Sequence, residues 1–432
     1  MSRFVIEGGH KLQGTIWASG NKNAALAVLP ACLLSDQPIT LHNIPDIQDV
    51  RTMLLIMQDL GAEVCQVGDG SWRIHARNLH KTELDPALAG RVRASFVISG
   101  PLLARMGQVS LPIPGGDVIG GRPLDTHVQG LRALGATVAL EARQGVFTIQ
   151  ANPLHGGGYF LQPEASVTAT ENTVMAAVLA RGETIIDNAA SEPHVQDLCH
   201  LLNQLGARIE GIGSNRLRIQ GVPSLGGGEF TIGADFMEVG SFIGAAAVTG
   251  GAVRIANASP ADLGMIGLVY GRLGVAWEVD GPDIVVPAGQ SLTIEPALGG
   301  RIPEIKPMPW PGFPPDLMSI LVVLASQSQG SVLLHDWMYE SRFFFVDKLK
   351  FMGAQIVLCD PHRVLVQGPS PLNANPQGVT SPDIRAGMAM VLAALCARGV
   401  STIHNIQQID RGYEQVEHKL RALGANITRL DS

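Results

Sequence analysis

A short phrase, Leu-Gly-Ala or a close variant of it, recurs six times along the chain of 432 residues. Successive glycines of the phrase lie 74, 71, 68, 79 and 71 positions apart, at Gly61, Gly135, Gly206, Gly274, Gly353 and Gly424. Each phrase follows a stretch in which apolar residues have helical spacing, as in residues 50–60. A glycine there suits a left-handed helix end, and the β-branched residues that follow suit a strand. The sequence therefore predicts six α/β repeats of about 70 residues each.

A second phrase supports this division. Short strand-like runs end in asparagine at Asn43, Asn188, Asn257 and Asn405, and helices are predicted over residues 171–180 and 384–397. Three repeats make a domain of ordinary size, so we expect two domains of roughly 200 residues each. The second repeat departs from the pattern, because residues 111–125 are rich in glycine and proline and predict a loop. A local failure of a repeated pattern marks a candidate functional site.

Composition limits the kinds of partner. Charged residues make up only 16% of the chain, and 31 Lys and Arg against 38 Asp and Glu give a net charge of −7. This balance disfavours nucleic acids and anionic membranes as partners. Five scattered cysteines and the lack of a signal-peptide pattern or a long apolar run lead us to expect a soluble cytoplasmic protein with reduced thiols.

Common cofactor motifs are missing from the sequence. It contains neither the phosphate-loop nor the dinucleotide-binding glycine pattern, and it lacks the H-E-x-x-H and G-x-S-x-G motifs. The 12 histidines are scattered. We therefore expect no metal and no cofactor.

Several charged residues stand among small and apolar neighbours at predicted element starts or in tight loops. They are Lys22, Arg93, Arg122, Asp316, Arg342, Asp383, Arg385 and Arg411. Any one of them alone is more simply a solvated surface charge. Together, the cations suggest a site for a highly charged anion.

Five motifs carry a resemblance to a known family. They are Gly20-Asn21-Lys22-Asn23-Ala24, the loop Gly-Gly-x-x-Ile-Gly-x-Arg-Pro that ends at Pro123, Gly312-Phe313-Pro314-Pro315-Asp316, Asp383-Ile384-Arg385-Ala386 and Asp410-Arg411-Gly412-Tyr413-Glu414. Together they resemble the UDP-N-acetylglucosamine 1-carboxyvinyltransferases, which belong to the enolpyruvyl transferase family. The shikimate-pathway branch of that family would show Asp-Lys-Ser-Ile-Ser-His-Arg near Lys22, and this chain does not.

The resemblance implies a fold and a reaction. The fold is α/β, with two inside-out α/β-barrel domains of three repeats each: residues 22–233, which carry the glycine-rich loop, and residues 1–21 with 234–432. The active site would lie between the two domains. The reaction moves the enolpyruvyl group of phosphoenolpyruvate to the 3-hydroxyl of UDP-N-acetylglucosamine and releases phosphate, as the first committed step of peptidoglycan synthesis.

The resemblance also implies residue roles. Lys22, Arg122 and Arg411 would hold phosphoenolpyruvate, and Arg93 and Arg385 would add positive field. Asp316 would meet the sugar hydroxyl as base or orienter, and Asp383 would assist proton transfer. The implied substrate contacts are Lys22, Asn23, Arg93, Arg122, Pro123, Leu124, Asp125, Ser166, Asp316, Met338, Arg342, Arg385 and Arg411.

Asp117 stands where most members of the family carry a cysteine, which is their proton donor and the target of the epoxide antibiotic fosfomycin. A carboxyl group in a closed site can deliver a proton, but it is a poor substitute for a soft thiolate nucleophile. The resemblance therefore implies an active enzyme that is largely insensitive to fosfomycin.

The other differences from the family are at residues implied to lie near the bound nucleotide. Val97, Glu164 and Thr168 replace residues that are usual in the family. A different nucleotide or sugar acceptor is therefore an alternative, and a catalytically silent binding protein is another. Retention of Lys22, Asp316 and Arg411 argues against the silent alternative.

Overall fold

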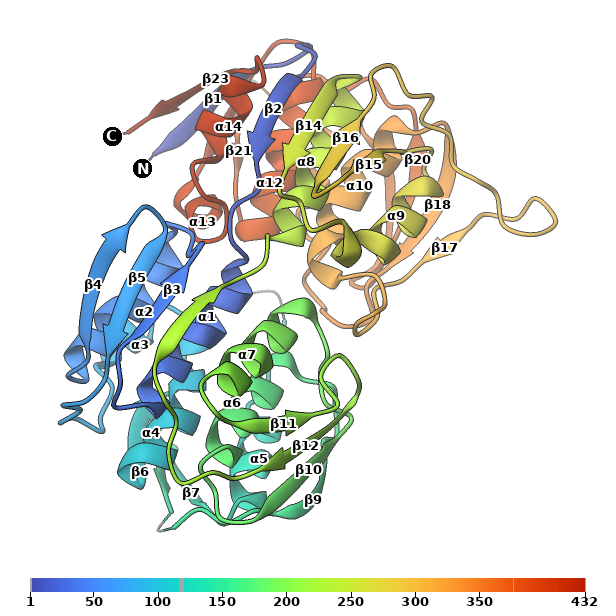
Figure 1. Cartoon of the computed structure of the whole chain (residues 1–432). Coiled ribbons are helices and arrows are strands. Elements are labelled where there is room, and N and C mark those ends of the chain that lie inside the picture. The colour runs from blue at the N-terminus through green and yellow to red at the C-terminus, as the bar shows by residue number, and fades with distance from the viewer. Residues whose placement is uncertain (1, 116–119, 152, 376, 432) are drawn as a thin grey trace. The chain divides into compact units, whose positions relative to one another are not determined.

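The computed structural model describes residues 2–115, 120–151, 153–375 and 377–431, and these divide into two compact units (Figure 1). Unit 1 comprises residues 2–19, 120–121 and 234–431 of the described chain. Unit 2 comprises the described residues of 20–115 and 122–233. Among the described residues, the chain therefore passes from one unit to the other next to Ser19, between Gly121 and Arg122, and next to Gly233.

Unit 2 holds the first three repeats. Its helices are α1 (Lys22–Ala31), α2 (Gln48–Asp59), α3 (Pro86–Ala89), α4 (Ser99–Met106), α5 (Asp125–Ala133), α6 (Val167–Ala177) and α7 (Pro193–Gln204), with 3-10 turns η1 (Cys32–Leu34) and η2 (Arg93–Ile98). Its strands are β3 (Ile39–His42), β4 (Glu63–Gly68), β5 (Ser71–His75), β6 (Gln108–Pro112), β7 (Thr137–Glu141), β8 (Val146–Gln150), β9 (Gly158–Leu161), β10 (Glu183–Asp187), β11 (Arg208–Glu210), β12 (Arg216–Gln220) and β13 (Gly228–Thr231).

Unit 1 holds the last three repeats. Its helices are α8 (Phe236–Thr249), α9 (Gly264–Gly271), α10 (Met318–Gln327), α11 (Val346–Phe351), α12 (Ile384–Cys396), α13 (Gln407–Asp410) and α14 (Val416–Ala422), with 3-10 turns η3 (Pro260–Leu263) and η4 (Pro315–Leu317). Its strands are β1 (Arg3–Glu7), β2 (Gln13–Trp17), β14 (Ala252–Ala256), β15 (Glu278–Asp280), β16 (Asp283–Val286), β17 (Glu304–Ile305), β18 (Gly330–His335), β19 (Gln355–Asp360), β20 (Arg363–Gly368), β21 (Val379–Thr380), β22 (Val400–His404) and β23 (Asn426–Leu430).

The repeat is confirmed in the backbone. Each of the six glycines of the recurring phrase follows a helix and precedes a strand, and each has a positive φ, between +82° and +107°. Glycine adopts this region without the steric cost that a Cβ would add. The helices predicted over 171–180 and 384–397 are α6 and α12.

The asparagines of the second phrase also have a common conformation. Asn43, Asn188, Asn257 and Asn405 each follow a strand directly and have φ values between +54° and +61°. Asparagine tolerates this left-handed region better than most residues. In the fifth repeat, strand β18 is followed by Asp336 instead.

The strands of the described residues form six separate sheets, one for each repeat, and do not close a barrel. Five sheets have four strands, in the orders β13-β3-β5-β4, β11-β12-β10-β9, β15-β16-β14-β2, β17-β18-β20-β19 and β21-β22-β1-β23. The second repeat, whose loop breaks the pattern, has the three-stranded sheet β6-β8-β7.

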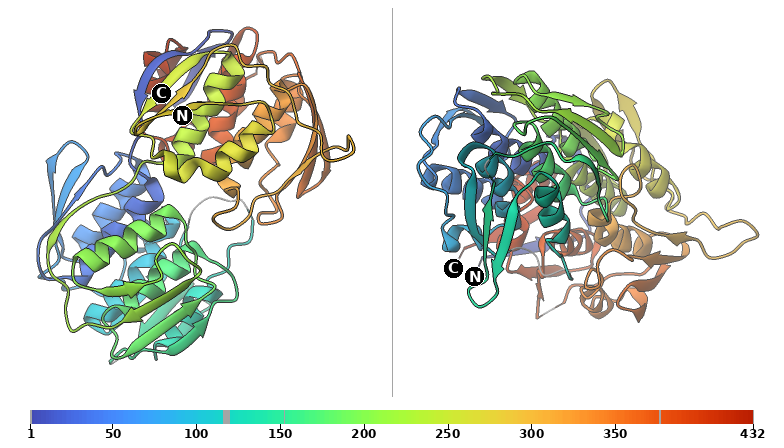
Figure 2. Two further views of the ribbon diagram at one scale, coloured as in Figure 1. Left: turned by 45° about the vertical axis from the view of Figure 1, so that its right-hand side comes forward. Right: turned by 90° about the horizontal axis from the view of Figure 1, so that it is seen from below.

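Each unit has helices at its centre and sheets around them (Figure 2). In unit 1, nearly every residue of α8, α10 and α12 is buried, and these helices contact one another. Helices α1, α4 and α6 occupy the same place in the repeats of unit 2 and are also largely buried. We call these six the inner helices. The expected α/β class, with helices inside and sheets outside, is confirmed.

The N-terminal segment completes two sheets of unit 1. Strand β1 lies between β22 and β23 and is antiparallel to both, with Arg3 opposite Leu430, so the two ends of the chain lie close together (Figure 2). Strand β2 pairs in parallel with β14. Among the described residues, we find no helix that is long and apolar enough to cross a membrane.

Candidate active site

Several of the predicted site residues stand at the N-terminal ends of inner helices. Lys22 begins α1, and Ser166 is the residue directly before α6. Asp383 directly precedes α12, while Asp316 lies in η4 just before α10. Free backbone N–H groups and a positive dipole end make such positions suitable for anions. Because each repeat starts with an inner helix, the repeat itself places these residues at equivalent positions.

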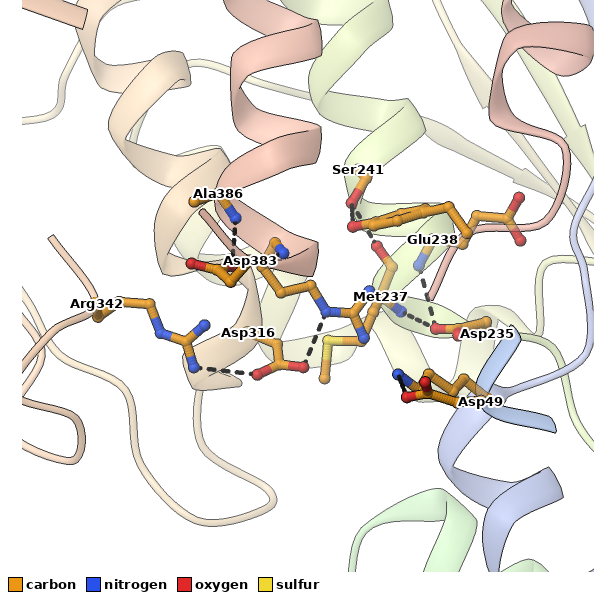
Figure 3. A network of polar contacts seen from close by, with 12 residues as sticks. Asp49, Asp235, Met237, Glu238, Ser241, Asp316, Arg342, Asp383 and Ala386 are labelled. Atoms are coloured by element: carbon orange, nitrogen blue, oxygen red, sulfur yellow. Dashed lines mark hydrogen bonds and ion pairs between the residues drawn. The ribbon is translucent and has the colours of Figure 1, made fainter. Parts of the chain in front are cut away.

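In unit 1, the carboxylate of Asp316 is held by two arginines (Figure 3). Its Oδ1 lies 3.2 Å from Nη2 of Arg342, and its Oδ2 accepts a 2.9 Å hydrogen bond from Nε of Arg385. Both arginine side chains are buried, whereas 30% of the Asp316 side chain is exposed. The acid is therefore fixed by buried cations but still accessible from outside.

Arg342 contacts a second carboxylate. Its Nε lies 3.5 Å from Oδ2 of Asp336, whose side chain is fully buried. Oδ1 of Asp336 accepts hydrogen bonds from the backbone N–H groups of Met338 and Tyr339, at 3.0 and 3.1 Å. Burial would lower the pKa of Arg342, but Asp316 and Asp336 outweigh this effect and raise it. The predicted contact residue Met338 thus belongs to the turn that positions Arg342.

Arg385 is enclosed on its other side by an aromatic residue. Its guanidinium lies 5.1 Å from the ring centre of Tyr413, and the Tyr413 hydroxyl is 2.8 Å from that of Ser241 on α8. Burial would lower the pKa of Arg385, and the neighbouring Tyr413 and Asp316 raise it instead. Arg385 therefore holds one oxygen of Asp316, and the positive field implied for it stays a prediction.

Two further aspartates of unit 1 cap inner helices. Oδ1 of Asp383 accepts 2.8 Å hydrogen bonds from the backbone N–H groups of Arg385 and Ala386, and Asp235 caps α8 in the same way (Figure 3). These bonds satisfy donors that a helix start otherwise leaves open. Asp383 is thus a structural cap, and the proton-transfer role implied for it stays a prediction. Arg411 follows α13 and donates a hydrogen bond to Oε1 of Gln408, at 3.1 Å.

In unit 2, Lys22 is paired with an acid that the sequence reading did not single out. Its Nζ lies 2.7 Å from Oδ2 of Asp49 in the first turn of α2, and both side chains are buried. Asn21 caps α1 through the backbone N–H of Ala24, while Asn23 is half-buried. The ammonium group is therefore held in one place by a carboxylate.

Arg93 is joined to the chain segment that follows the glycine-rich loop. Its Nη2 donates a hydrogen bond to the backbone carbonyl of Arg122. Pro123 and Leu124 continue from there to Asp125, which begins α5. The structure thus brings Arg93 together with the predicted run 122–125. Asp117 lies outside the described residues.

A buried polar chain lies beneath this run. Asn172 Nδ2 is 3.2 Å from Nδ1 of His127, and Nε2 of His127 is 3.0 Å from Oγ1 of Thr168. Burial, with a smaller contribution from Arg93, lowers the pKa of His127 to about 3, so the ring is neutral at physiological pH. Because the amide faces Nδ1 as a donor, Nε2 carries the proton and donates to Thr168.

The structure also locates the other residues that differ from those usual in the family. Oε1 of Glu164 accepts a 3.1 Å hydrogen bond from the Thr126 hydroxyl, while Val97 is buried in η2. Glu164 and Thr168 therefore contact the two residues that directly follow the run 122–125. Within the described part of the chain, no group of three or more His, Cys, Asp or Glu is arranged to hold a metal.

Asp49 and Asp336 are the site residues that sequence reasoning missed. Asp49 had the signal of an acid in the first turn of a helix. Asp336 stands where four other repeats have asparagine after the corresponding strand. Neither feature predicts the cation that the acid contacts, because Lys22 and Arg342 lie on other elements than Asp49 and Asp336.

A family model described as EPSP synthase (3-phosphoshikimate 1-carboxyvinyltransferase) matches residues 6–420. The chain belongs to this family. EPSP synthase family members with curated descriptions include the UDP-N-acetylglucosamine 1-carboxyvinyltransferase of Treponema pallidum (strain Nichols), which is 54% identical over 99% of both chains. The enzyme of the same name from Borreliella burgdorferi (strain B31) is 52% identical over the whole of both chains.

Solved structures agree with the fold of the EPSP synthase family. The enolpyruvyl transferase NikO from Streptomyces tendae aligns with a TM-score of 0.88 at 23% identity, over 100% of this chain and 99% of that one. An EPSP synthase from Acinetobacter baumannii aligns over both whole chains, with a TM-score of 0.75 at 18% identity.

Proposed function

We propose that this EPSP synthase family member is a UDP-N-acetylglucosamine 1-carboxyvinyltransferase. It transfers the enolpyruvyl group of phosphoenolpyruvate to the 3-hydroxyl of UDP-N-acetylglucosamine, releases phosphate, and acts in the cytoplasm at the start of peptidoglycan synthesis. The observation that carries the proposal is the carboxylate of Asp316 between two buried arginines. Relatives of that name, more than half identical over the full length, support the choice of acceptor.

The reaction needs a base and an acid in turn. In the addition step, the sugar hydroxyl loses its proton and its oxygen bonds to C2 of phosphoenolpyruvate, while C3 gains a proton. In the elimination step, C3 loses a proton and the bond from C2 to the phosphate oxygen breaks. A base at the hydroxyl and an acid at C3 therefore suffice for the addition. In the elimination, the deprotonated acid takes the proton back from C3, and the proton held by the base leaves with the phosphate.

Asp316 is our candidate for the group at the sugar hydroxyl. It is accessible, and Arg342 and Arg385 fix both of its oxygens, so it is held in place before the substrate arrives. We expect Asp316→Asn to lower kcat at least about 100-fold, the usual scale of a lost base, with a small change in the melting temperature. A variant with parent kcat would remove Asp316 from this role.

The cations bind the anionic groups of both substrates in the proposal. Lys22, Arg122 and Arg411 take the phosphate and carboxylate of phosphoenolpyruvate. Asn23, Ser166 and the run 122–125 take the sugar nucleotide, with Met338 and Arg342. Lys22 enters this role already paired with Asp49, so a bound phosphate would share the ammonium with that carboxylate.

We assign the acid at C3 to Asp117. The test compares Asp117→Asn and Asp117→Cys with the parent in the same assay. We expect the Asn variant to lose turnover, and the Cys variant to turn over and to become sensitive to fosfomycin, because only a thiolate opens the epoxide readily. Covalent modification of Asp117 by the drug in the parent would contradict the assignment.

The acceptor is tested by the product. Purified full-length chain is incubated with phosphoenolpyruvate and one acceptor, with phosphate release measured alongside the mass of the enolpyruvyl product. We expect product from UDP-N-acetylglucosamine and none from shikimate 3-phosphate, since the motif around Lys22 differs from that branch of the family.

A different nucleotide sugar is the second candidate acceptor. It is favoured by the contacts of Glu164 with Thr126 and of Thr168 with His127, next to the proposed nucleotide-binding run. Other nucleotide sugars in the same assay decide between the two. Faster product formation from one of them would replace UDP-N-acetylglucosamine as the acceptor, and a parent without product from any acceptor would refute the proposed activity.

A further inference from the structure

In the fifth repeat, the residue directly after strand β18 is an aspartate, whereas four other repeats have an asparagine at the corresponding position. Asn43, Asn188, Asn257 and Asn405 end the corresponding strands elsewhere, and here the residue is Asp336. Its side chain is 0% exposed. A carboxylate is costly to bury unless it is paired, so the replacement of a neutral amide by an acid needs a reason.

The backbone of Asp336 is held independently of its side chain. Its N–H donates to the carbonyl of His362 at 2.8 Å, and its carbonyl lies 2.7 Å from Nδ1 of the same histidine. Oδ1 caps the turn at Met338 and Tyr339, and an asparagine Oδ1 can accept the same two bonds. The strand end and the turn therefore do not need the negative charge.

The charge has one evident recipient, which is Arg342. The Nε edge of the guanidinium lies 3.5 Å from Oδ2 of Asp336, and Nη2 lies 3.2 Å from Oδ1 of Asp316. The Arg342 side chain is 1% exposed, and its guanidinium lies 5.0 Å from the ring centre of Tyr339. One buried cation thus bridges a fully buried carboxylate and an accessible one.

Sharing the cation changes what Asp316 can do. A carboxylate held by two guanidinium groups is stabilised in its charged form and is therefore a weak base. A second carboxylate on one of those guanidinium groups offsets part of its positive charge and repels the negative charge on Asp316. Both effects favour proton uptake by Asp316, and the bridge also fixes the direction of Arg342.

We propose that Asp336 is a positioning residue that sets the basicity of Asp316 by sharing the charge of Arg342. The proposal rests on the proposed function, in which Asp316 takes the proton of the acceptor hydroxyl. Asp336 acts through Arg342 and contacts no substrate. Its carboxylate is the feature that separates the fifth repeat from the repeats with asparagine.

Other charged and titratable groups lie around Arg342, Arg385 and Asp336 and are unchanged in the test. They are Arg385 and Asp383 at the start of α12, Tyr339 in the turn after β18, Lys348 on α11, His362 before β20, Asp235 before α8 and Tyr413 after α13.

The experiment compares Asp336→Asn and Asp336→Ala with the parent, by pH profiles of kcat and kcat/KM with product detection. Asn keeps the cap and removes the charge, and Ala removes both. We expect both variants to lose roughly three- to tenfold in kcat, with their acid limbs moved to lower pH by about one unit and KM nearly unchanged. If the acid only caps the turn, Asp336→Asn matches the parent and Asp336→Ala alone is impaired, which would overturn the proposal.

The matched control is Asp283→Asn. Asp283 also joins an arginine, at 2.7 Å from Arg254, and accepts a backbone N–H from Asn257, but it lies in the fourth repeat away from the candidate site. Its profile should equal that of the parent. If Asp336→Asn lowers the melting temperature strongly, Asp336→Glu is the variant that tests the proposal. It keeps the negative charge, so its pH profile should have the same acid limb as that of the parent. A shifted acid limb in Asp336→Glu would also overturn the proposal.

Failure of the two proposals gives different results. A parent without enolpyruvyl product refutes the proposed function and the inference with it. An active parent with an unaltered Asp336→Asn profile refutes the inference alone.

Discussion

In unit 1, two arginines each meet more than one carboxylate. Arg342 contacts Asp316 and Asp336, and Arg429 binds both Asp410 and Glu417. Such bridges fix side-chain directions, because a planar guanidinium presents donors along several edges. At the scale of single residues, the candidate site is therefore held in place before any ligand binds.

Glu171 is the opposite case, a buried acid without such a partner. It lies on α6, its Oε1 has no hydrogen-bond partner among the described residues, and burial, followed by the nearby Glu192, raises its pKa well above the usual value. The unfolded chain releases this proton near its ordinary pKa, whereas the folded chain retains it. Stability is therefore lost as pH rises above that ordinary pKa.

We predict that Glu171→Gln increases the free energy of unfolding in neutral and alkaline solution. The gain should grow by up to about 1.4 kcal/mol for each pH unit above the unfolded pKa. Urea unfolding between pH 5 and pH 9, at about one-unit intervals, measures the difference between variant and parent. Glu210→Gln, at an exposed position of β11, is the control. A difference that stays constant with pH would mean that Glu171 is ionised in the folded chain.

Sequence reasoning reached Asp316, Arg342 and Arg385 but not their mutual arrangement. These residues can be recognised in the sequence because they are charged and stand in short motifs among small and apolar residues. That Arg385 lies on Asp316 depends on how α10 and α12 lie against each other, which no local pattern encodes. For the same reason Asp49 and Asp336 were missed, since each is recognisable only beside the cation it contacts.

At the scale of elements, the repeat was the most predictable feature. The recurring glycines gave the helix ends and following strands of all six repeats, and the asparagines gave four strand ends. The pairing of strands that are far apart in the sequence was harder to predict. The assignment of the N-terminal segment to the same domain as residues 234–432 came from the family resemblance. Periodicity alone predicts no partner for β1, because strand pairing depends on residues far apart in the sequence.

The repeat glycines should differ in how well they tolerate a side chain. A Cβ at Gly274 would lie 2.6 Å from the backbone nitrogen of Thr293 and 2.7 Å from the carbonyl oxygen of Ser291, whereas a Cβ at Gly206 would meet nothing within 4 Å. Both glycines have positive φ, at +82° and +104°. The two positions therefore separate the cost of conformation from the cost of collision.

We predict that Gly206→Ala lowers the free energy of unfolding by about 1–2 kcal/mol, the conformational cost alone. Gly274→Ala should cost at least about 1 kcal/mol more, because rigid backbone must move. Denaturant unfolding of both variants with the parent measures this. Equal losses would show that the turn at residues 291–293 moves aside freely.

At the scale of the whole molecule, the described residues form two separate hydrophobic cores. One is built around α8, α10 and α12, and the other around α1, α4 and α6, with no buried residue common to both clusters. In the part of the chain that the structure describes, the two units are joined next to Ser19, Gly121 and Gly233. Each core should therefore contribute its own cooperative transition.

We predict that Leu321→Ala and Leu29→Ala each shift a different transition. Both leucines are 0% exposed, Leu321 in the core of unit 1 and Leu29 in that of unit 2, and each truncation should cost about 2–5 kcal/mol. Denaturant unfolding followed by hydrogen exchange and mass spectrometry identifies which segments open in each transition. A single transition that both variants shift equally would contradict this expectation.

The pairing of β1 with β22 and β23 has a consequence for synthesis on the ribosome. Strand β1 is made before its two neighbours, which follow only after about 400 further residues, and this takes on the order of tens of seconds. Residues 20–233 contain all the strands of their own sheets and can fold during that interval. Strand β1 must therefore stay without its two partner strands, or be shielded by a chaperone, until β22 and β23 have left the exit tunnel.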